Sequence, residues 1–160
     1  MNWHEKNAEF NALIKQLFHD DDWKKRAEAA RQLGLLKDGR ATNLMCRALR
    51  SEKDHIVINR IIEALGRISD GRATLRIIEL LLEEREKEEP DKYRIIYIIE
   101  SLIKIKDKRA LSYLGPLLAS SDDDVRDLTL RAFDVIEPRW KEIVDRERNK
   151  SIQEIFKTKY

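Results

Sequence analysis

A short pattern that recurs along the chain constrains the possible folds more than any other feature of the sequence. The pattern Leu-Gly-x-x-x-Asp-Gly-Arg-Ala occupies residues 33–41 and 65–73, and a weaker copy without the glycines occupies residues 102–110. The copies are 32 and 37 residues apart, measured between the shared aspartates Asp38, Asp70 and Asp107. Periods of this length are typical of stacked supersecondary units. The sequence therefore predicts a repeat protein.

Each copy follows an apolar segment that itself begins after an aspartate. These aspartates are separated by 32, 37 and 31 residues, and they are Asp22, Asp54, Asp91 and Asp122. Apolar residues then recur three and four positions apart, which is the spacing of one helical face. An aspartate before a helix accepts hydrogen bonds from the free amides of the first turn. We therefore expect four first helices, each capped by its aspartate.

Second helices are expected directly after the Asp-x-Arg positions, where the helical spacing of apolar residues resumes. Connections this short are typical of antiparallel helical hairpins. The longest interval contains the charged residues 83–90, which predict an overlong second helix that ends in a turn before Pro90. Pro116 should bend the second helix of the third pair, because it lacks a backbone donor.

These landmarks predict an all-α fold, a right-handed α-solenoid of about four antiparallel helix pairs with capping helices at both ends. A composition rich in Ile, Leu and Ala, with five Gly and three Pro, favours helices. We expect a single domain over residues 1–160. Its parts are an N-terminal cap helix at 1–19 and repeat units at 20–53, 54–90, 91–121 and 122–160.

The quoted motifs resemble the HEAT-like repeat of the phycobilin-lyase type over about residues 20 to 136. Units of that family read Val-Arg-x-x-Ala-Ala-x-Ala-Leu-Gly followed by Asp-x-Arg-Ala. The matching segments are 29–34 with 38–41, 64–66 with 70–73, and Val125-Arg126. The third unit has Ile103 in place of the glycine, and the fourth lacks the Asp-x-Arg. The resemblance implies a helical scaffold that occurs in many unrelated settings, including bilin lyases.

Charge and cysteine content restrict the compartment and the class of partner. The chain has 32 Lys and Arg against 30 Asp and Glu, so basic residues are not in strong excess, as most nucleic-acid partners require. The single cysteine, Cys46, excludes an intramolecular disulfide and suggests a reducing compartment. The chain shows no long apolar run and no export signal, so we expect a cytoplasmic protein without membrane association. The many charged residues and abundant Ile would suit a thermophile.

The recurring Asp-x-Arg residues allow two interpretations. In the first they form a structural ladder, in which each arginine bonds an aspartate or the free carbonyls of an adjacent unit. In the second the arginines form a basic row for an anionic ligand. We favour the ladder, whose members are Asp38, Arg40, Asp70, Arg72, Asp107 and Arg109.

No residues are placed as a catalytic or metal-binding set. The histidines His4, His19 and His55 lack the close spacing that metal ligands require. The acidic runs 20–22 and 122–124 lack the glycine and distal glutamate of a calcium loop, and fit helix caps. Cys46 has no base nearby in the sequence. We therefore predict no cofactor, no metal and no enzymatic activity.

The outer side of the second helices, expected to line a concave face, supplies the candidate partner-binding residues. These are Arg47, Arg50, Leu75, Ile78, Glu79 and Leu82. The three apolar ones lie outside the predicted core stripe and are either a contact site or covered by another segment.

The leading prediction for function is a non-enzymatic scaffold that binds another protein on this face. One alternative is nucleic-acid binding, which needs Arg47, Arg50, Arg76 and Tyr113 on one surface. A third is a bilin lyase-like accessory protein. The sequence does not specify the oligomeric state.

Overall fold

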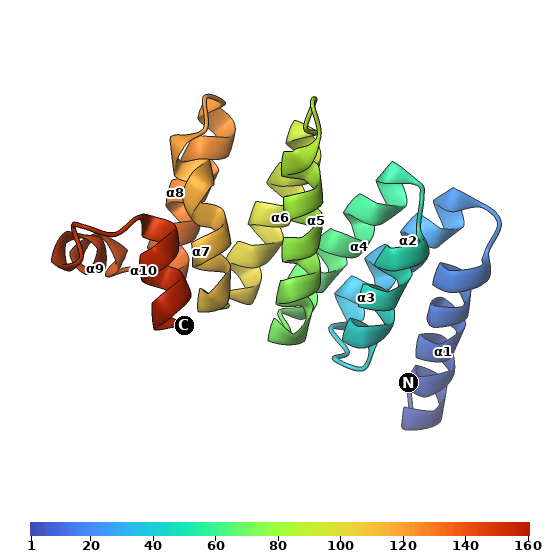
Figure 1. The fold of residues 1–160 in the computed structure, drawn as a ribbon. Helices are drawn as coiled ribbons and strands as arrows, with labels where there is room; N and C mark the ends of the chain where they lie inside the picture. Colours follow the sequence, from blue (N-terminus) through green and yellow to red (C-terminus); the bar gives the residue numbers. More distant parts are fainter. The chain divides into compact units, whose positions relative to one another are not determined.

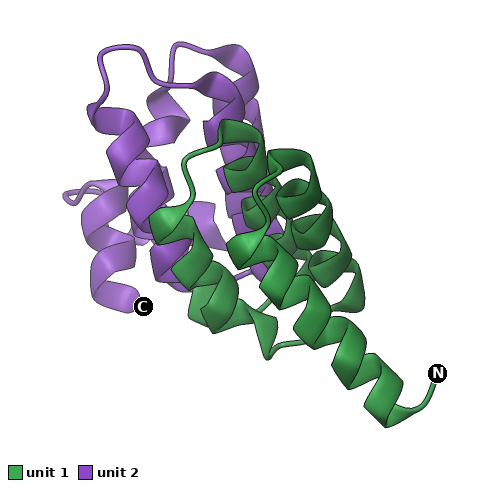
Figure 2. Ribbon diagram, turned by 90° about the vertical axis from the view of Figure 1, so that its right-hand side faces the viewer, with its two compact units in different colours: residues 1–73 green, residues 74–160 purple.

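The computed structural model describes residues 1–160, and every regular element in it is helical. This confirms the all-α prediction. The chain divides into two compact units, unit 1 at Met1–Ala73 and unit 2 at Thr74–Tyr160 (Figure 2). The division falls inside the predicted repeat unit 54–90, between its first helix and its second. No helix is both long enough and apolar enough to cross a membrane.

Unit 1 contains four α-helices and one short 3₁₀ helix (Figure 1). The helices are α1 (Trp3–His19), α2 (Trp23–Leu36), α3 (Ala41–Ser51) and α4 (His55–Ile68), followed by η1 (Gly71–Ala73). α2 packs most extensively against α4 and also against α1, while α3 contacts α1 and α4. The packed helix pairs are those of a helical-repeat fold.

The starts of these helices follow the sequence landmarks. A capping box joins Asn2 and Glu5 at the start of α1. Asp22 accepts a hydrogen bond from the Lys24 amide at the start of α2, and Asp54 caps α4 in the same way. Aspartate caps thus satisfy backbone donors that would otherwise lack an intrahelical partner.

The ends of the first helices use a conformation that the sequence does not announce. Lys37 and Ser69 in unit 1, and Lys106 in unit 2, have φ values of 52°, 61° and 59°. Each is a left-handed cap, and none is the glycine that usually occupies such a position. Its backbone N–H donates to a carbonyl in the last turn of the preceding helix, such as Leu65 for Ser69.

Gly34 lies where α2 passes close to Ala64 of α4. A Cβ atom added at this position would lie 2.9 Å from both Cα and Cβ of Ala64. The glycine in the interior of α2 therefore allows a close helix crossing, which offsets the roughly 1 kcal/mol that it costs relative to alanine.

Unit 2 begins with α5 (Thr74–Glu86) and α6 (Lys92–Ile105) and continues through η2 (Lys108–Ala110), α7 (Leu111–Leu114) and η3 (Gly115–Ala119) to α8 (Asp123–Ile136), α9 (Trp140–Arg146) and α10 (Ile152–Lys159). α6 packs against α5 and α8, and α10 packs against α7. At Pro116 the chain continues as the 3₁₀ helix η3, so the expected second helix has only one α-helical turn before it changes form.

Two buried clusters stabilise the irregular parts of unit 2. Glu84, almost fully buried, accepts hydrogen bonds from the Asp91 amide at 2.6 Å and from Lys87 Nζ at 2.8 Å, which fastens the charged insertion after α5. Near the C-terminus, the ring of Phe133 lies 5.1 Å from Trp140 and 5.6 Å from Phe156, centroid to centroid. These aromatic contacts join α8, α9 and α10.

Candidate functional site

The Asp-x-Arg residues of unit 1 form contacts both within and between repeats. Arg40 binds Asp38 at 2.7 Å, donates to Asn7 Oδ1 of α1 at 2.8 Å, and lies 4.3 Å from the Phe10 ring centroid. Its guanidinium lowers the pKa of Asp38. Each contact uses the guanidinium of an exposed side chain whose charge is already matched by a carboxylate.

Arg72 has the same arrangement one repeat later in unit 1. It binds Asp70 at 2.6 Å and donates to the carbonyl of Gly39, in the preceding Asp-x-Arg motif, at 3.1 Å. The Arg72 hydrogen bond lowers the pKa of Asp70 to about 2, opposed by partial burial and assisted by the Arg72 amide. The buried hydroxyl of Thr42 makes no well-formed hydrogen bond, and its weak contact with Asp70 acts in the same direction.

In unit 2, Asp107 and Arg109 form the corresponding pair at 2.7 Å. Burial opposes ionisation of Asp107, but the hydrogen bonds from Arg109 outweigh it, so the pKa of Asp107 is lowered. All three arginines are thus bound to their own aspartates, two residues earlier in the chain. Because their charges are compensated, they do not form a row of free cations.

The candidate partner-binding residues differ in accessibility. On α3 of unit 1, Arg47 and Arg50 are exposed. On α5 of unit 2, Leu75 is 48% and Leu82 39% exposed, and Glu79 lies between them on the same face. These residues are available to a partner.

Ile78 is different, because only 2% of its surface is exposed. The expectation that it lies outside the core is therefore wrong. The buried side of α5 is wider than the predicted stripe and includes Thr74 and Ile78, which are four positions apart on one face. The predicted contact surface is thus reduced to Leu75, Glu79 and Leu82 on this helix.

The residues proposed for nucleic-acid binding are divided between the two units, and one of them is already paired. Arg76 has a side chain only 11% exposed and is paired with Glu79 at 2.7 Å, so its charge is already bound. Arg47 and Arg50 belong to unit 1, whereas Arg76 and Tyr113 belong to unit 2. Neither unit alone contains the combination that this alternative requires.

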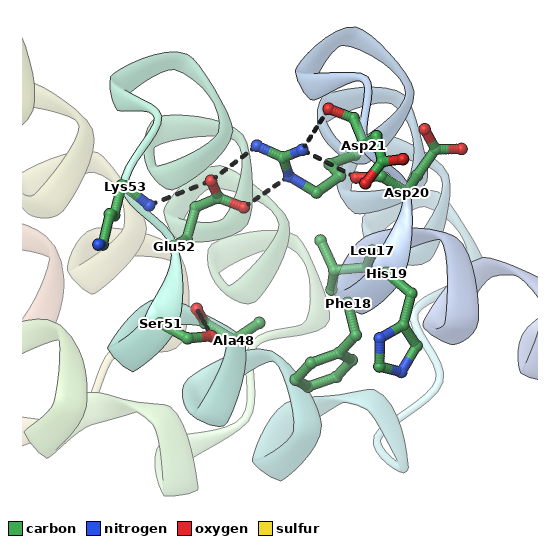
Figure 3. A pocket seen from close by; sticks show the side chains of 10 residues that line it. Leu17, Phe18, His19, Asp20, Asp21, Ala48, Ser51, Glu52 and Lys53 are labelled. Carbon is green, nitrogen blue, oxygen red and sulfur yellow. Dashed lines mark hydrogen bonds and ion pairs between the residues drawn. The ribbon is translucent and has the colours of Figure 1, made fainter.

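A pocket of about 390 Å³ in unit 1 lies where the ends of α1 and α3 meet the start of α2 (Figure 3). We call it the α1–α3 pocket. Its lining residues are Leu17, Phe18, His19, Asp20, Asp21, Arg26, Ala48, Ser51, Glu52 and Lys53. Leu17, Phe18 and Ala48 provide apolar surface, and the rest provide charged and polar groups. Such a mixture is typical of sites for ligands with both apolar and charged parts.

A bidentate ion pair holds one wall of this pocket. Arg26 Nε lies 3.0 Å from Glu52 Oε2, and its terminal nitrogen lies 3.1 Å from Glu52 Oε1. Arg26 also donates to the Asp20 carbonyl at 2.8 Å. The Glu52 hydrogen bond raises the pKa of Arg26. Because each partner satisfies the other, this pair builds the pocket and is not free to bind a ligand.

The sequence contains a signal for this pair that lies outside the repeat motifs. Arg26 follows the capping Asp22 by four residues, and Arg126 follows the capping Asp122 by four residues. Arg126 likewise reaches the loop before its own helix, at the Ser120 carbonyl. The recurrence identifies a structural arginine. Its partner Glu52, however, is 26 residues away in the sequence, and no sequence motif points to it.

The pocket offers groups for binding more clearly than groups for nucleophilic catalysis. His19, Asp21 and Lys53 are exposed at its edge. The hydroxyl of Ser51 donates to the Ala48 carbonyl at 3.3 Å, so it is engaged with the backbone of its own helix. No group of three or more His, Cys, Asp or Glu side chains in the structure is arranged to hold a metal ion.

Comparison with known proteins adds two findings. The family model for HEAT repeats matches residues 10–90, which include the α1–α3 pocket. The chain is also 30% identical over 129 residues to the bilin biosynthesis protein PecE of Mastigocladus laminosus. That similarity covers 77% of this chain and 46% of the relative, so the chain spans about half the length of the protein that it matches.

These findings confirm the resemblance derived from the repeat motifs and correct one prediction. The expectation that the chain has no enzymatic activity is contradicted, because the matched relative is a biosynthesis protein. The prediction relied on the lack of a convergent catalytic set in the sequence. A helical repeat that contributes to biosynthesis by holding a substrate does not need such a set, so that argument was insufficient.

Proposed function

The chain belongs to the HEAT-repeat family, and from this premise we propose that it is a bilin lyase-like accessory protein, which holds a linear tetrapyrrole for attachment to another protein. The observation that carries the proposal is the 30% identity over 129 residues to a bilin biosynthesis protein. A shared repeat architecture alone would not distinguish this function from others on the same fold.

The α1–α3 pocket has the chemistry to receive part of such a molecule. A linear tetrapyrrole has flat apolar ring faces, ring N–H donors and propionate carboxylates. The half-buried Phe18 supplies a surface for a ring face, Asp20 and Asp21 supply acceptors for ring N–H groups, and Lys53 supplies a cation for a propionate. At about 390 Å³ the pocket admits a portion of the tetrapyrrole, and the remainder lies outside it.

A titration with biliverdin, a linear tetrapyrrole, tests binding. We expect a saturable change in visible absorption and an induced circular-dichroism signal. Lys53→Ala and His19→Ala should each weaken binding by about threefold to tenfold, because each removes one polar contact at the edge of the pocket. The matched controls are Lys24→Ala and His4→Ala, which remove an exposed lysine and an exposed histidine outside the lining.

Attachment is tested separately by adding an acceptor protein with a reactive cysteine. The chain should accelerate the appearance of bilin fluorescence that migrates with the acceptor on a denaturing gel. No spectral change with biliverdin at any concentration would exclude the proposal. If the pocket variants and their controls weaken binding equally, the chain binds biliverdin but the α1–α3 pocket is not the binding site.

A protein-binding role for the α5 face is supported by the exposure of Leu75 and Leu82 beside Glu79. Under the proposed function, the partner is the protein that accepts the bilin. The double variant Leu75→Ser and Leu82→Ser should slow attachment while leaving biliverdin binding unchanged. Leu130→Ser is the control, since Leu130 is similarly exposed, at 37%, but lies on α8. Equal slowing by both variants would contradict a specific docking role for α5.

A further inference from the structure

A second pocket, of about 300 Å³, lies in unit 2 where α9 and α10 face the start of η2. We call it the C-terminal basic pocket. Four cationic side chains line it, and they come from three different elements and the turn before α9: Lys108, Arg139, Arg146 and Lys159. The nearly buried Ile143 provides the apolar part of its wall. Convergence of like charges on one cavity is unfavourable unless an anion compensates it.

The two acidic residues of this pocket are already engaged. Glu137, 7% exposed, accepts hydrogen bonds from the Tyr160 hydroxyl and pairs with Lys108 Nζ at 3.1 Å. The Tyr160 hydrogen bond contributes most to lowering the pKa of Glu137, so this group is ionised at neutral pH. Glu142 pairs with Arg139 at 3.0 Å. These pairs compensate two of the four cations.

Arg146 and Lys159 remain without a carboxylate partner. Lys159 lies 6.0 Å from the Tyr160 ring centroid, a contact that leaves its ammonium donors free. Arg146 makes no ion pair, and its side chain is exposed at the edge of the cavity. A guanidinium and an ammonium from two different helices that line one cavity can bind two oxygens of one ligand, because arginine matches planar or tetrahedral oxyanions bidentately.

We propose that the C-terminal basic pocket binds a small dianion that presents oxygen acceptors, either one phosphate group or two neighbouring carboxylates. Arg146 and Lys159 bind the charged oxygens, Ile143 contacts any carbon skeleton, and the pairs of Lys108 with Glu137 and Arg139 with Glu142 form the rest of the wall. The site belongs entirely to unit 2. It is therefore independent of the tetrapyrrole proposal, which rests on the pocket in unit 1.

Calorimetric titration of the full chain with inorganic phosphate and, in a separate experiment, with glutarate tests the proposal and distinguishes the two ligand sources. Two charge-assisted contacts predict a dissociation constant on the order of 1 mM for the preferred ligand at low ionic strength. Arg146→Gln and Lys159→Gln should each weaken binding by about tenfold. Chloride at the same ionic strength should not displace the ligand.

The matched controls are Arg148→Gln and Lys157→Gln, which remove the same charges from neighbouring exposed positions that do not line the pocket. They should change affinity by less than about twofold, through long-range screening alone. Lack of saturable heat with both ligands would overturn the proposal. So would equal weakening by the control and pocket variants, since that would indicate binding to the general charge of this region. Circular dichroism of each variant establishes that it is folded.

Discussion

In unit 1, α2 and α4 approach each other closely at small residues, whereas the last helices of unit 2 are joined by large aromatic side chains. The buried residues of α2 are Ala29, Ala30, Leu33 and Gly34. The buried residues of α4 include the small Ala64 and Gly66. Unit 2 instead joins α8, α9 and α10 by the rings of Phe133, Trp140 and Phe156. The crossing of α2 and α4 thus relies on close backbone approach, and the end of unit 2 relies on side-chain volume.

Truncation of the aromatic cluster should give the largest effect. Phe133→Ala removes a fully buried ring and should lower the free energy of unfolding by about 3–5 kcal/mol. Leu33→Ala, which also removes a fully buried side chain, should cost less because leucine has fewer buried atoms than phenylalanine. Urea denaturation of both variants measures this difference. Equal losses would show that the two units depend on side-chain volume to the same extent.

Adding a methyl group should destabilise unit 1 more than unit 2, which is the reverse of the order expected for truncation. Gly34→Ala places a Cβ 2.9 Å from backbone and side-chain atoms of Ala64, and should destabilise the protein by about 1–3 kcal/mol. Gly115→Ala in unit 2 places a Cβ 3.3 Å from the Ile152 side chain and 3.4 Å from the Gln153 side chain, both of which can adjust, so its cost should be smaller. Thermal unfolding of the two variants provides the comparison, and a stabilised Gly34→Ala protein would contradict the close crossing.

The smallest expected effect is the pH-dependent stabilisation of the folded state by the pair of Asp70 and Arg72 in unit 1. The pKa of Asp70 is lowered to about 2, so ionised Asp70 stabilises the folded state above the ordinary aspartate pKa of 3.8. This contribution, about 1 kcal/mol after allowance for solvent screening, should be lost as the pH falls from about 4 to 2. Asp70→Asn should therefore flatten the decline of the urea midpoint over this range. An unchanged acid profile would mean that Arg72 does not stabilise the ionised form.

The sequence predicts the starts of helices better than their ends or their long-range partners. Asp22, Asp54, Asp91 and Asp122 all cap helices, because an N-cap uses a local side chain with a recognisable identity. The left-handed caps escape prediction because lysine and serine carry no signal for that conformation. The burial of Ile78 was missed because a stripe derived from spacing does not give the width of the covered face.

The candidate sites were harder to predict than the fold, for a physical reason. The α1–α3 pocket collects residues from three helices and two connections, and the pair of Arg26 and Glu52 that shapes it spans 26 residues of sequence. Periodicity reports which residues share one helical face, but it does not report which helix ends meet. The prediction of no enzymatic activity failed for a different reason, since it took the lack of a convergent catalytic set as sufficient evidence.

The left-handed caps at Lys37, Ser69 and Lys106 have a further consequence for how the surface at each bend can vary. Two cationic residues and one neutral residue adopt nearly the same backbone angles, so the geometry of the bend does not depend on the chemistry of the side chain. Each bend can therefore change its own electrostatic character by substitution at a single position, while the direction in which the next helix leaves that bend stays the same.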